Sequence, residues 1–188
     1  MNIIIRPEAG ADHDAIEALT VAAFLNAPHT DHNEQLIVRD LRQAGALSLS
    51  LVAELAGQVV GHLCFSPVTI SDGSPHWYGL GPISVSPALH GKGLGSRLMD
   101  AGLAELKGMG AAGCVVLGDP GFYGRFGFVP EPRVTLPGVP PEYFMALLFG
   151  AAMPRGEVCY HPAFVQGVSP HLEEDESRSL KVVQPCRF

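Results

Sequence analysis

The stretch Ile83–Met99, with the sequence ISVSPALHGKGLGSRLM, is the most informative part of this chain of 188 residues. It predicts a short strand over Ile83–Val85, a Ser-Pro stop, and a helix that begins near Gly93. The connection carries glycine at alternate positions, namely Gly91, Gly93 and Gly95. The first amides of a helix have no intrahelical partner and carry the positive end of the helix dipole. This junction therefore predicts an anion site, most naturally for a phosphate group.

Two common phosphate-binding loops do not fit the spacing of these glycines. A dinucleotide fingerprint, G-x-G-x-x-G, counted from Gly91 needs a third glycine where the chain has Ser96. A nucleotide P-loop, G-x-x-x-x-G-K-S/T, needs a glycine at Ser86 and a hydroxyl residue after Lys92, where the chain has Gly93. Both classes of nucleotide loop are therefore excluded.

The run HGKGLG, residues 90–95, resembles the acyl-CoA pyrophosphate loop of the GNAT superfamily of N-acetyltransferases. That loop has the pattern Q/R-x-x-G-x-G/A and follows a strand of the form x-V-x-P. The positions that match in register are Val85, Pro87, Gly93 and Gly95. His90 stands where the family usually has Gln or Arg, at a position that works partly through its backbone.

A second motif, FYGRFGF, lies further along the chain at Phe122–Phe128. It resembles the F-Y-x-x-x-G-F run that the family carries after its next strand. The longer stretch LGDPGFYGRFGF, residues 117–128, resembles a bacterial subgroup often called YhbS-like. In the order of its elements, the resemblance covers Ile3–Val129.

The resemblance implies acetyl-CoA as co-substrate, and no metal. The residues that it assigns to the cofactor are Ile83, Ser84, Val85, His90, Gly91, Lys92, Gly93, Leu94, Gly95 and Ser96. It implies that the pantetheine arm pairs like a strand with Ile83–Val85, while the glycine loop holds the pyrophosphate. A backbone amide near Val85 would then stabilise the oxyanion of the tetrahedral intermediate.

Two residues are candidates for proton transfer. Tyr123 matches the family position that protonates the departing thiolate, and a phenol with a pKa of about 10 suits a thiol of about 8.5. Glu34, in the region that lines the acceptor site in the family, is the candidate base for the attacking amine. His62, His76 and a relay through water are the alternatives for that base.

The rest of the chain predicts alternating elements of an α/β (α+β) protein. The expected elements are a strand at 3–5, a helix capped by Asp12, a helix over 31–43, strands over 49–55, 59–70 and 76–85, a helix over 93–108, a strand at 114–117, a helical turn at 122–126, and strands at 128–129, 143–149 and 157–160. This order predicts a mixed, mostly antiparallel central sheet flanked by helices, and the resemblance implies that it splays at the acyl-CoA site. Glycine and proline within 76–85 predict a bulge or a place where a ligand meets the backbone. We expect one domain over 1–167 and a tail over 168–188.

Composition narrows the class of protein. The net charge of −7 and the pI of about 5.5 argue against a nucleic-acid binder, whose footprint is a basic patch. Four cysteines without a CxxC pair predict free thiols in a reducing cytoplasm and no metal motif. The N-terminus lacks a signal-peptide pattern and no apolar run is long enough to span a membrane, so we expect a cytoplasmic protein.

The two motifs together predict an N-acetyltransferase that acts on a small amine, a peptide N-terminus or a protein lysine. A non-catalytic acyl-CoA-binding or sensor module of the same fold is the main alternative. An O-acyltransferase or a longer-chain acyltransferase is the third, because acyl length depends on the depth of a cavity. The resemblance also allows a homodimer.

Overall fold

The computed structural model describes residues 2–27, 30, 32–150 and 152–165, and these belong to two compact units. Of these residues, the first unit comprises those up to 66 and 80–109, and the second comprises 67–79 and those from 110 to 165. Strand β5 (Trp77–Val85) passes from the second unit into the first. The tail predicted over 168–188 lies outside the described residues.

The first unit contains the predicted N-terminal elements and the helix after the glycine loop. Its elements are β1 (Ile3–Pro7), η1 (Gly10–Asp12), α1 (His13–Phe24), α2 (Glu34–Gln43), β2 (Leu49–Leu55), β3 (Gln58–Pro67, whose last residue belongs to the second unit), the end of β5, η2 (Pro87–Leu89) and α3 (Leu94–Gly108). As predicted, α2 ends before Gly45, which takes a left-handed φ of +65°.

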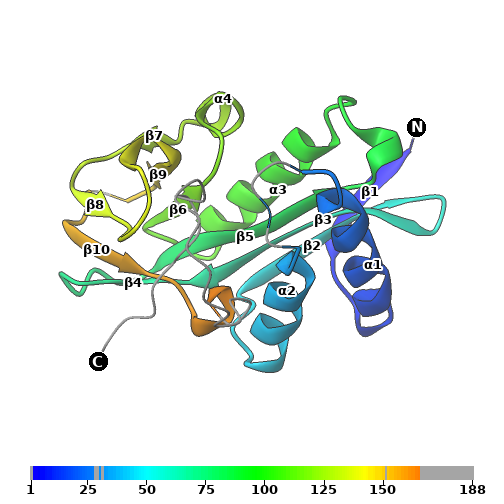
Figure 1. The fold of residues 1–188 in the computed structure, drawn as a ribbon, viewed down its shortest axis with the longest axis horizontal. Coiled ribbons are helices and arrows are strands. Elements are labelled where there is room, and N and C mark those ends of the chain that lie inside the picture. Colours follow the sequence, from blue (N-terminus) through cyan, green and yellow to red (C-terminus); the bar gives the residue numbers. More distant parts are fainter. Residues whose placement is uncertain (1, 28–29, 31, 151, 166–188) are drawn as a thin grey trace, which may run out of the picture. The chain divides into compact units, whose positions relative to one another are not determined.

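The sheet of the first unit is antiparallel and covered on both faces. β1 pairs with β2 and β2 pairs with β3, each in antiparallel register. Alternate side chains of a strand face opposite sides of a sheet. On β3, Cys64 packs with Ile16 of α1 and Val38 of α2, whereas Phe65 faces α3, where a Cβ added to Gly102 would lie 2.8 Å from its ring. Hence α1 and α2 cover one face and α3 covers the other (Figure 1).

The second unit is built mainly from short strands. Its elements are β4 (Thr69–Ile70), the start of β5, β6 (Gly113–Leu117), α4 (Pro120–Tyr123), η3 (Gly124–Phe126), β7 (Val129–Pro130), β8 (Val134–Thr135), η4 (Pro141–Tyr143), β9 (Phe144–Leu148), β10 (Gly156–Cys159) and η5 (Pro162–Phe164). β6 pairs in parallel with β5 over Trp77–Gly79, and β9 pairs antiparallel with both β6 and β7. β10 lies between β4, antiparallel, and β8, parallel.

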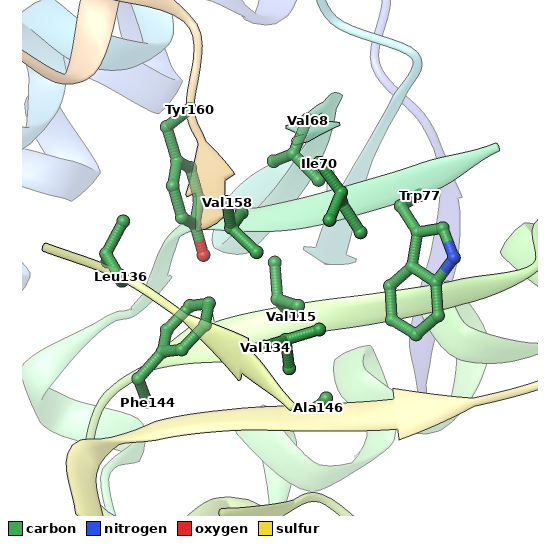
Figure 2. Close-up of a cluster of buried hydrophobic side chains, with 10 residues drawn as sticks. All are labelled: Val68, Ile70, Trp77, Val115, Val134, Leu136, Phe144, Ala146, Val158 and Tyr160. Carbon is green, nitrogen blue, oxygen red and sulfur yellow. The ribbon is translucent and has the colours of Figure 1, made fainter. Parts of the chain in front are cut away.

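A buried cluster holds the second unit together (Figure 2). Its members are Val68, Ile70, Trp77, Val115, Val134, Leu136, Phe144, Ala146, Val158 and Tyr160. The Trp77 ring lies against Gly113, where an added Cβ would fall 2.3 Å from the indole. Antiparallel pairs predominate in both units, so the predicted mixed, mostly antiparallel sheet flanked by helices is confirmed.

Two local predictions are wrong. The strand predicted over 59–70 is interrupted, because β3 ends at Pro67, which has no amide to donate, and Thr69–Ile70 pairs instead with β10. Asp12 precedes α1 but makes no capping bond. Its carboxylate accepts two hydrogen bonds from Arg6, at 2.7 and 3.0 Å, and one from the amide of Ala9 at 2.7 Å.

The cysteines also differ in part from expectation. Cys64 and Cys114 are buried, and neither forms a disulfide. Cys159 is disulfide-bonded, so the prediction of a free thiol is wrong at this position, and Cys186 lies outside the described residues. The lack of a CxxC pair excludes a local motif, but a disulfide depends on which Cα atoms approach in three dimensions.

Candidate active site

The glycine loop leads from the end of β5 to α3 through the short turn η2. The amide of Ser86 donates to the carbonyl of Val60 on β3 at 2.9 Å. His90 Nε2 lies 2.9 Å from the carbonyl oxygen of Val85. Because a carbonyl oxygen only accepts, Nε2 carries the proton of this hydrogen bond. The imidazole therefore ties the loop back to the end of the strand.

Gly91 and Gly93 give this loop its shape. Both have left-handed backbones, with φ of +72° and +77°, yet an added Cβ on either would meet nothing within 4 Å. Glycine is thus needed here for conformation and not for space. Gly93 is the N-cap of α3 and has no side chain, so among the described residues this end of the helix has no side-chain capping bond from its N-cap position. The amides of residues 94–96 therefore remain available to an anion, as the sequence predicts.

Two cations flank the loop, and both donate to nearby backbone. Lys92 Nζ donates to the carbonyl of Ala88 at 3.0 Å, and Arg97 Nη2 donates to the carbonyl of Ile3 at 3.0 Å. Their charges lie near the α3 N-terminus, where they favour a negative ligand. The direct hydrogen bonds that this loop can offer a phosphate come mainly from backbone amides.

β5 contains an extra residue relative to β3. Ser86, the residue after β5, donates its amide to Val60, and a Cβ on Gly81 of β5 would lie 2.6 Å from Cys64 Sγ. Between these two contacts β3 advances four residues, from 60 to 64, whereas the other segment advances five, from 81 to 86. We infer a β-bulge between Gly81 and Ser86, within the segment that holds the predicted cofactor strand.

The glycines within β5 make room for side chains. A Cβ on Gly79 would lie 2.3 Å from Tyr160 Cε1, and one on Gly81 would collide with Cys64 Sγ. These contacts already require glycine at both positions, whether or not a ligand meets the backbone there.

Helix α1 is tied to the bulged end of β5. Ser84 Oγ donates to Thr20 Oγ1 at 3.2 Å, and Thr20 Oγ1 donates to the carbonyl of Ile16 at 2.8 Å. Both hydroxyl residues are fully buried. This pair fixes the middle of α1 beside the residue that precedes Val85.

A pocket of about 160 Å³ lies between α1 and α2. Its lining residues are Val21, Phe24, Leu25, His32, Glu34 and Gln35. Glu34 is the first residue of α2, which begins later than the predicted helix, and its Oε1 accepts a hydrogen bond from the Thr30 hydroxyl. Its Oε2 is buried and has no hydrogen-bond partner among the residues that the structure describes.

Tyr123 lies in the second unit, on a turn that follows β6. Asp119 Oδ1 caps this turn by accepting the Gly121 amide at 2.8 Å, and Pro120 occupies the first helical position. The Tyr123 ring lies against Gly118, where an added Cβ would come within 2.4 Å of Cε2. It also meets the Phe128 ring edge-on at 6.1 Å. The conformation of the tyrosine is therefore fixed by the FYGRFGF motif itself.

The Tyr123 hydroxyl is available for chemistry. Within the described part of the chain it makes no hydrogen bond, so it does not serve to hold a backbone group in place. Burial raises the pKa of this phenol above its usual value, so its proton is retained at neutral pH. Arg125, by contrast, stacks over Phe122, with its guanidinium carbon 4.8 Å from the ring centroid.

Tyr160 is a residue that the sequence does not single out. It follows β10, its ring covers Gly79, and its hydroxyl is buried without a hydrogen-bond partner in the described residues. Figure 2 shows this hydroxyl pointing into the apolar cluster on the side of Leu136 and Phe144. The only signal in the sequence is indirect, because Gly79 within a strand indicates that something approaches the backbone closely.

The two candidate histidines have different surroundings. His62 is fully buried, and its Nε2 lies 2.9 Å from Ser50 Oγ. His76 is exposed, with a positive φ of 62°, in the turn before β5.

The ten predicted cofactor residues and Glu34 all lie in the first unit, and Tyr123 lies in the second. Among the described residues, no cluster of three or more His, Cys, Asp or Glu side chains is arranged to hold a metal ion.

The chain belongs to the acetyltransferase (GNAT) family, whose model matches residues 13–128. Over 127 residues it is 39% identical to YhbS of Escherichia coli (strain K12), an uncharacterised N-acetyltransferase, covering 67% of this chain and 73% of YhbS. Both levels of the resemblance, to the superfamily and to the YhbS-like subgroup, are thus confirmed.

Two solved structures are similar over most of the chain. A GNAT family acetyltransferase from Brucella melitensis, in complex with acetyl-CoA, is 48% identical with a TM-score of 0.77, covering 87% of this chain and 98% of that one. E. coli YhbS in complex with CoA is 34% identical with a TM-score of 0.79, covering 87% and 92%. No helix in the described part of this chain is long and apolar enough to cross a membrane.

Proposed function

We propose that this protein transfers the acetyl group of acetyl-CoA to a primary amine. The observation that carries the proposal is the uncapped N-terminus of α3, preceded by left-handed Gly91 and Gly93. Such a terminus suits a pyrophosphate, and two similar structures hold acetyl-CoA or CoA.

The first unit supplies the groups proposed to bind the cofactor. The pyrophosphate accepts hydrogen bonds from the loop amides of residues 91–96, with Lys92 and Arg97 adding positive charge nearby. The pantetheine arm pairs with the backbone of Ile83–Val85 beyond the bulge. An amide near Val85 stabilises the oxyanion that forms when the amine attacks the thioester carbonyl.

Tyr123 is the proposed general acid. The amine nitrogen forms a bond to the acetyl carbon, the carbon–sulfur bond breaks, and the CoA sulfur leaves with the electron pair. The Tyr123 phenol gives its proton to that sulfur and is later reprotonated from solvent. Its hydroxyl without a described partner supports this role, although burial raises the pKa of the phenol and so makes it a weaker acid.

Glu34 is the proposed base for the amine. Its unpartnered Oε2 can accept a hydrogen bond from an N–H of the acceptor, and then the proton that the amine loses. His62 is less suited to direct contact with the substrate, because its side chain is fully buried among Glu8, Ser50 and Arg42.

The replacement Tyr123→Phe tests the catalytic part of the proposal. A panel of amines and peptides is assayed by thiol release, and acetyl-CoA binding is measured by calorimetry. We expect turnover to fall about 100-fold or more with acetyl-CoA affinity retained. Tyr143→Phe, at an exposed tyrosine of the same unit, is the matched control and keeps full turnover. Tight acetyl-CoA binding without turnover on any acceptor would instead support the non-catalytic module.

A further inference from the structure

The pocket between α1 and α2 indicates which class of amine is the acceptor. We infer that it binds a primary ammonium ion attached to an apolar group about the size of a benzene ring. This inference rests on the proposed function, because it identifies the pocket as the place where the acceptor is held.

The size and lining of the pocket define the apolar part of the ligand. The pocket measures about 160 Å³ and is open to solvent on one side. Its volume is similar to that of the enclosed apolar cavities of roughly 150 Å³ that accept benzene. Its apolar wall is formed by Val21 and Phe24 of α1 and by Leu25, the residue after the helix. Two of these side chains are unusually exposed for their type, Val21 at 46% and Leu25 at 62%. A ligand ring seated here would cover apolar surface that is now in contact with water.

The charge of the pocket defines the polar part. Glu34 contributes a carboxylate whose Oε1 is already bonded to Thr30 and whose Oε2 is buried without a described partner. A buried carboxylate oxygen without a donor is costly, and a bound ammonium group supplies both the hydrogen bond and the opposite charge once the Glu34 carboxylate turns toward the pocket. His32 and Gln35 are the other polar lining residues, and Glu34 is the acidic one. A neutral hydroxyl ligand of the same shape can donate a hydrogen bond to the carboxylate but does not supply the opposite charge.

The pocket is linked to the proposed reaction strand by α1. Phe24 lies one helical turn after Thr20, so both project from the same face of α1. Thr20 bonds Ser84, the residue before Val85. An amine held between Phe24 and Glu34 therefore lies on the side of β5 that α1 covers, within the same unit as the proposed cofactor strand.

Benzylamine is the probe, and benzyl alcohol is its neutral isostere. Calorimetry of the full chain without acetyl-CoA measures binding directly, independent of any acetyl transfer. We expect benzylamine to bind at least about tenfold more tightly than benzyl alcohol, which lacks the charged hydrogen bond. We expect the same margin over ethanolamine, which lacks the ring. Glu34→Gln should remove the preference for the amine over the alcohol. Asp40→Asn makes the same change of charge on the same helix, outside the pocket, and should leave that preference intact.

A second variant tests the apolar wall. Val21→Phe fills the pocket from an exposed position that tolerates a larger side chain, and should abolish benzylamine binding while acetyl-CoA affinity is unchanged. Equal affinities for benzylamine and benzyl alcohol, or benzylamine binding that survives both Glu34→Gln and Val21→Phe, overturn the inference. If other amines are acetylated while benzylamine is not bound, only this inference fails. If benzylamine binds as expected but no thiol is released from acetyl-CoA, the proposed function fails.

Discussion

Glu8, the residue after β1, is the centre of a buried polar cluster beneath α2. Arg42 donates to its two oxygens at 2.8 and 3.0 Å, and the Ser50 hydroxyl donates to Oε2. Because the single proton of Ser50 is given to Glu8, His62 Nε2 must donate to Ser50 Oγ across the 2.9 Å between them. His62 therefore carries a proton on Nε2, and its buried Nδ1 has no partner among the described residues.

This cluster predicts that stability falls in acid. Burial would raise the pKa of Glu8, but His62, Arg42 and Ser50 outweigh it and hold the pKa well below its usual range. Burial lowers the pKa of His62. Since both folded pKa values are depressed, the unfolded chain binds more protons in acid. The contribution of the two groups to the free energy of unfolding is therefore full above about pH 6.5. It decreases below about pH 6.5, where His62 of the unfolded chain gains a proton, and decreases further below about pH 4.5, where Glu8 of the unfolded chain does so.

Urea unfolding between pH 7 and pH 3 measures the effect. The wild type should lose about 2 kcal/mol through Glu8 alone between pH 5 and pH 3. Glu8→Gln should be less stable at pH 7 and should show a flatter dependence on pH over that range. Parallel curves for the two proteins would contradict this account of the cluster.

Among single residues, the sequence predicts those whose role depends on their neighbours in the chain. Gly91 and Gly93 need left-handed backbone to turn into α3, and this need is visible in the spacing of the glycines. The roles of Tyr160 and of the Glu8 cluster are not visible. Glu8 meets Arg42, Ser50 and His62 across 34, 42 and 54 residues of sequence, and no local pattern marks such partners.

Helix α3 shows how one glycine positions an element. Gly102 lies where α3 meets β3, and an added Cβ would fall 2.8 Å from Phe65 Cε2 and 3.0 Å from Leu63 Cδ2. Gly108, the last residue of the same helix, would place a Cβ in open space. The first glycine therefore permits close packing on the sheet, whereas the second has no packing role.

Alanine at these two positions should have opposite effects. Gly102→Ala should destabilise the protein by about 1–3 kcal/mol through overpacking. Gly108→Ala should be neutral or stabilise it by up to about 1 kcal/mol, because alanine favours the helix. Free energies of unfolding from urea titrations test both, and similar values for the two variants would show that α3 does not pack on β3 through Gly102.

At the scale of elements, long segments with strong periodicity are predictable and short paired segments are not. α2, α3 and β2 follow from their patterns and stops. β4 and β8 contain two residues each and exist because β10 pairs with both. The partner strand is more than twenty residues away from β8 in sequence and farther from β4, so pairing and not propensity defines them.

The whole molecule carries a net charge of −7, while its proposed ligand is itself an anion. Long-range electrostatics therefore oppose binding, and local contacts must supply the affinity. The amides at the start of α3 are neutral dipoles, and the side chains of Lys92 and Arg97 already donate to the backbone. An anion site of this kind differs from one that depends on several free cations.

Because neutral amides dominate the site, the affinity for acetyl-CoA should depend only weakly on the salt concentration. Raising the ionic strength from about 20 to about 200 mM shortens the range of the repulsion, so the Kd for acetyl-CoA should change less than about threefold. Lys92→Gln should likewise weaken binding less than about threefold, since its amide is retained. Calorimetric titrations at the two salt concentrations test this. A loss of affinity of more than about tenfold in high salt would show that side-chain cations dominate the site.

Calorimetric titration of acetyl-CoA into the wild-type chain tests the central claim most directly. The account predicts one acetyl-CoA bound per chain, with a Kd on the order of micromolar to submillimolar, as for substrates of typical enzymes. It also predicts that CoA competes for the same site, through the shared pyrophosphate and pantetheine. The absence of binding heat at about 1 mM acetyl-CoA, a concentration at the upper end of typical Michaelis constants, would contradict the account.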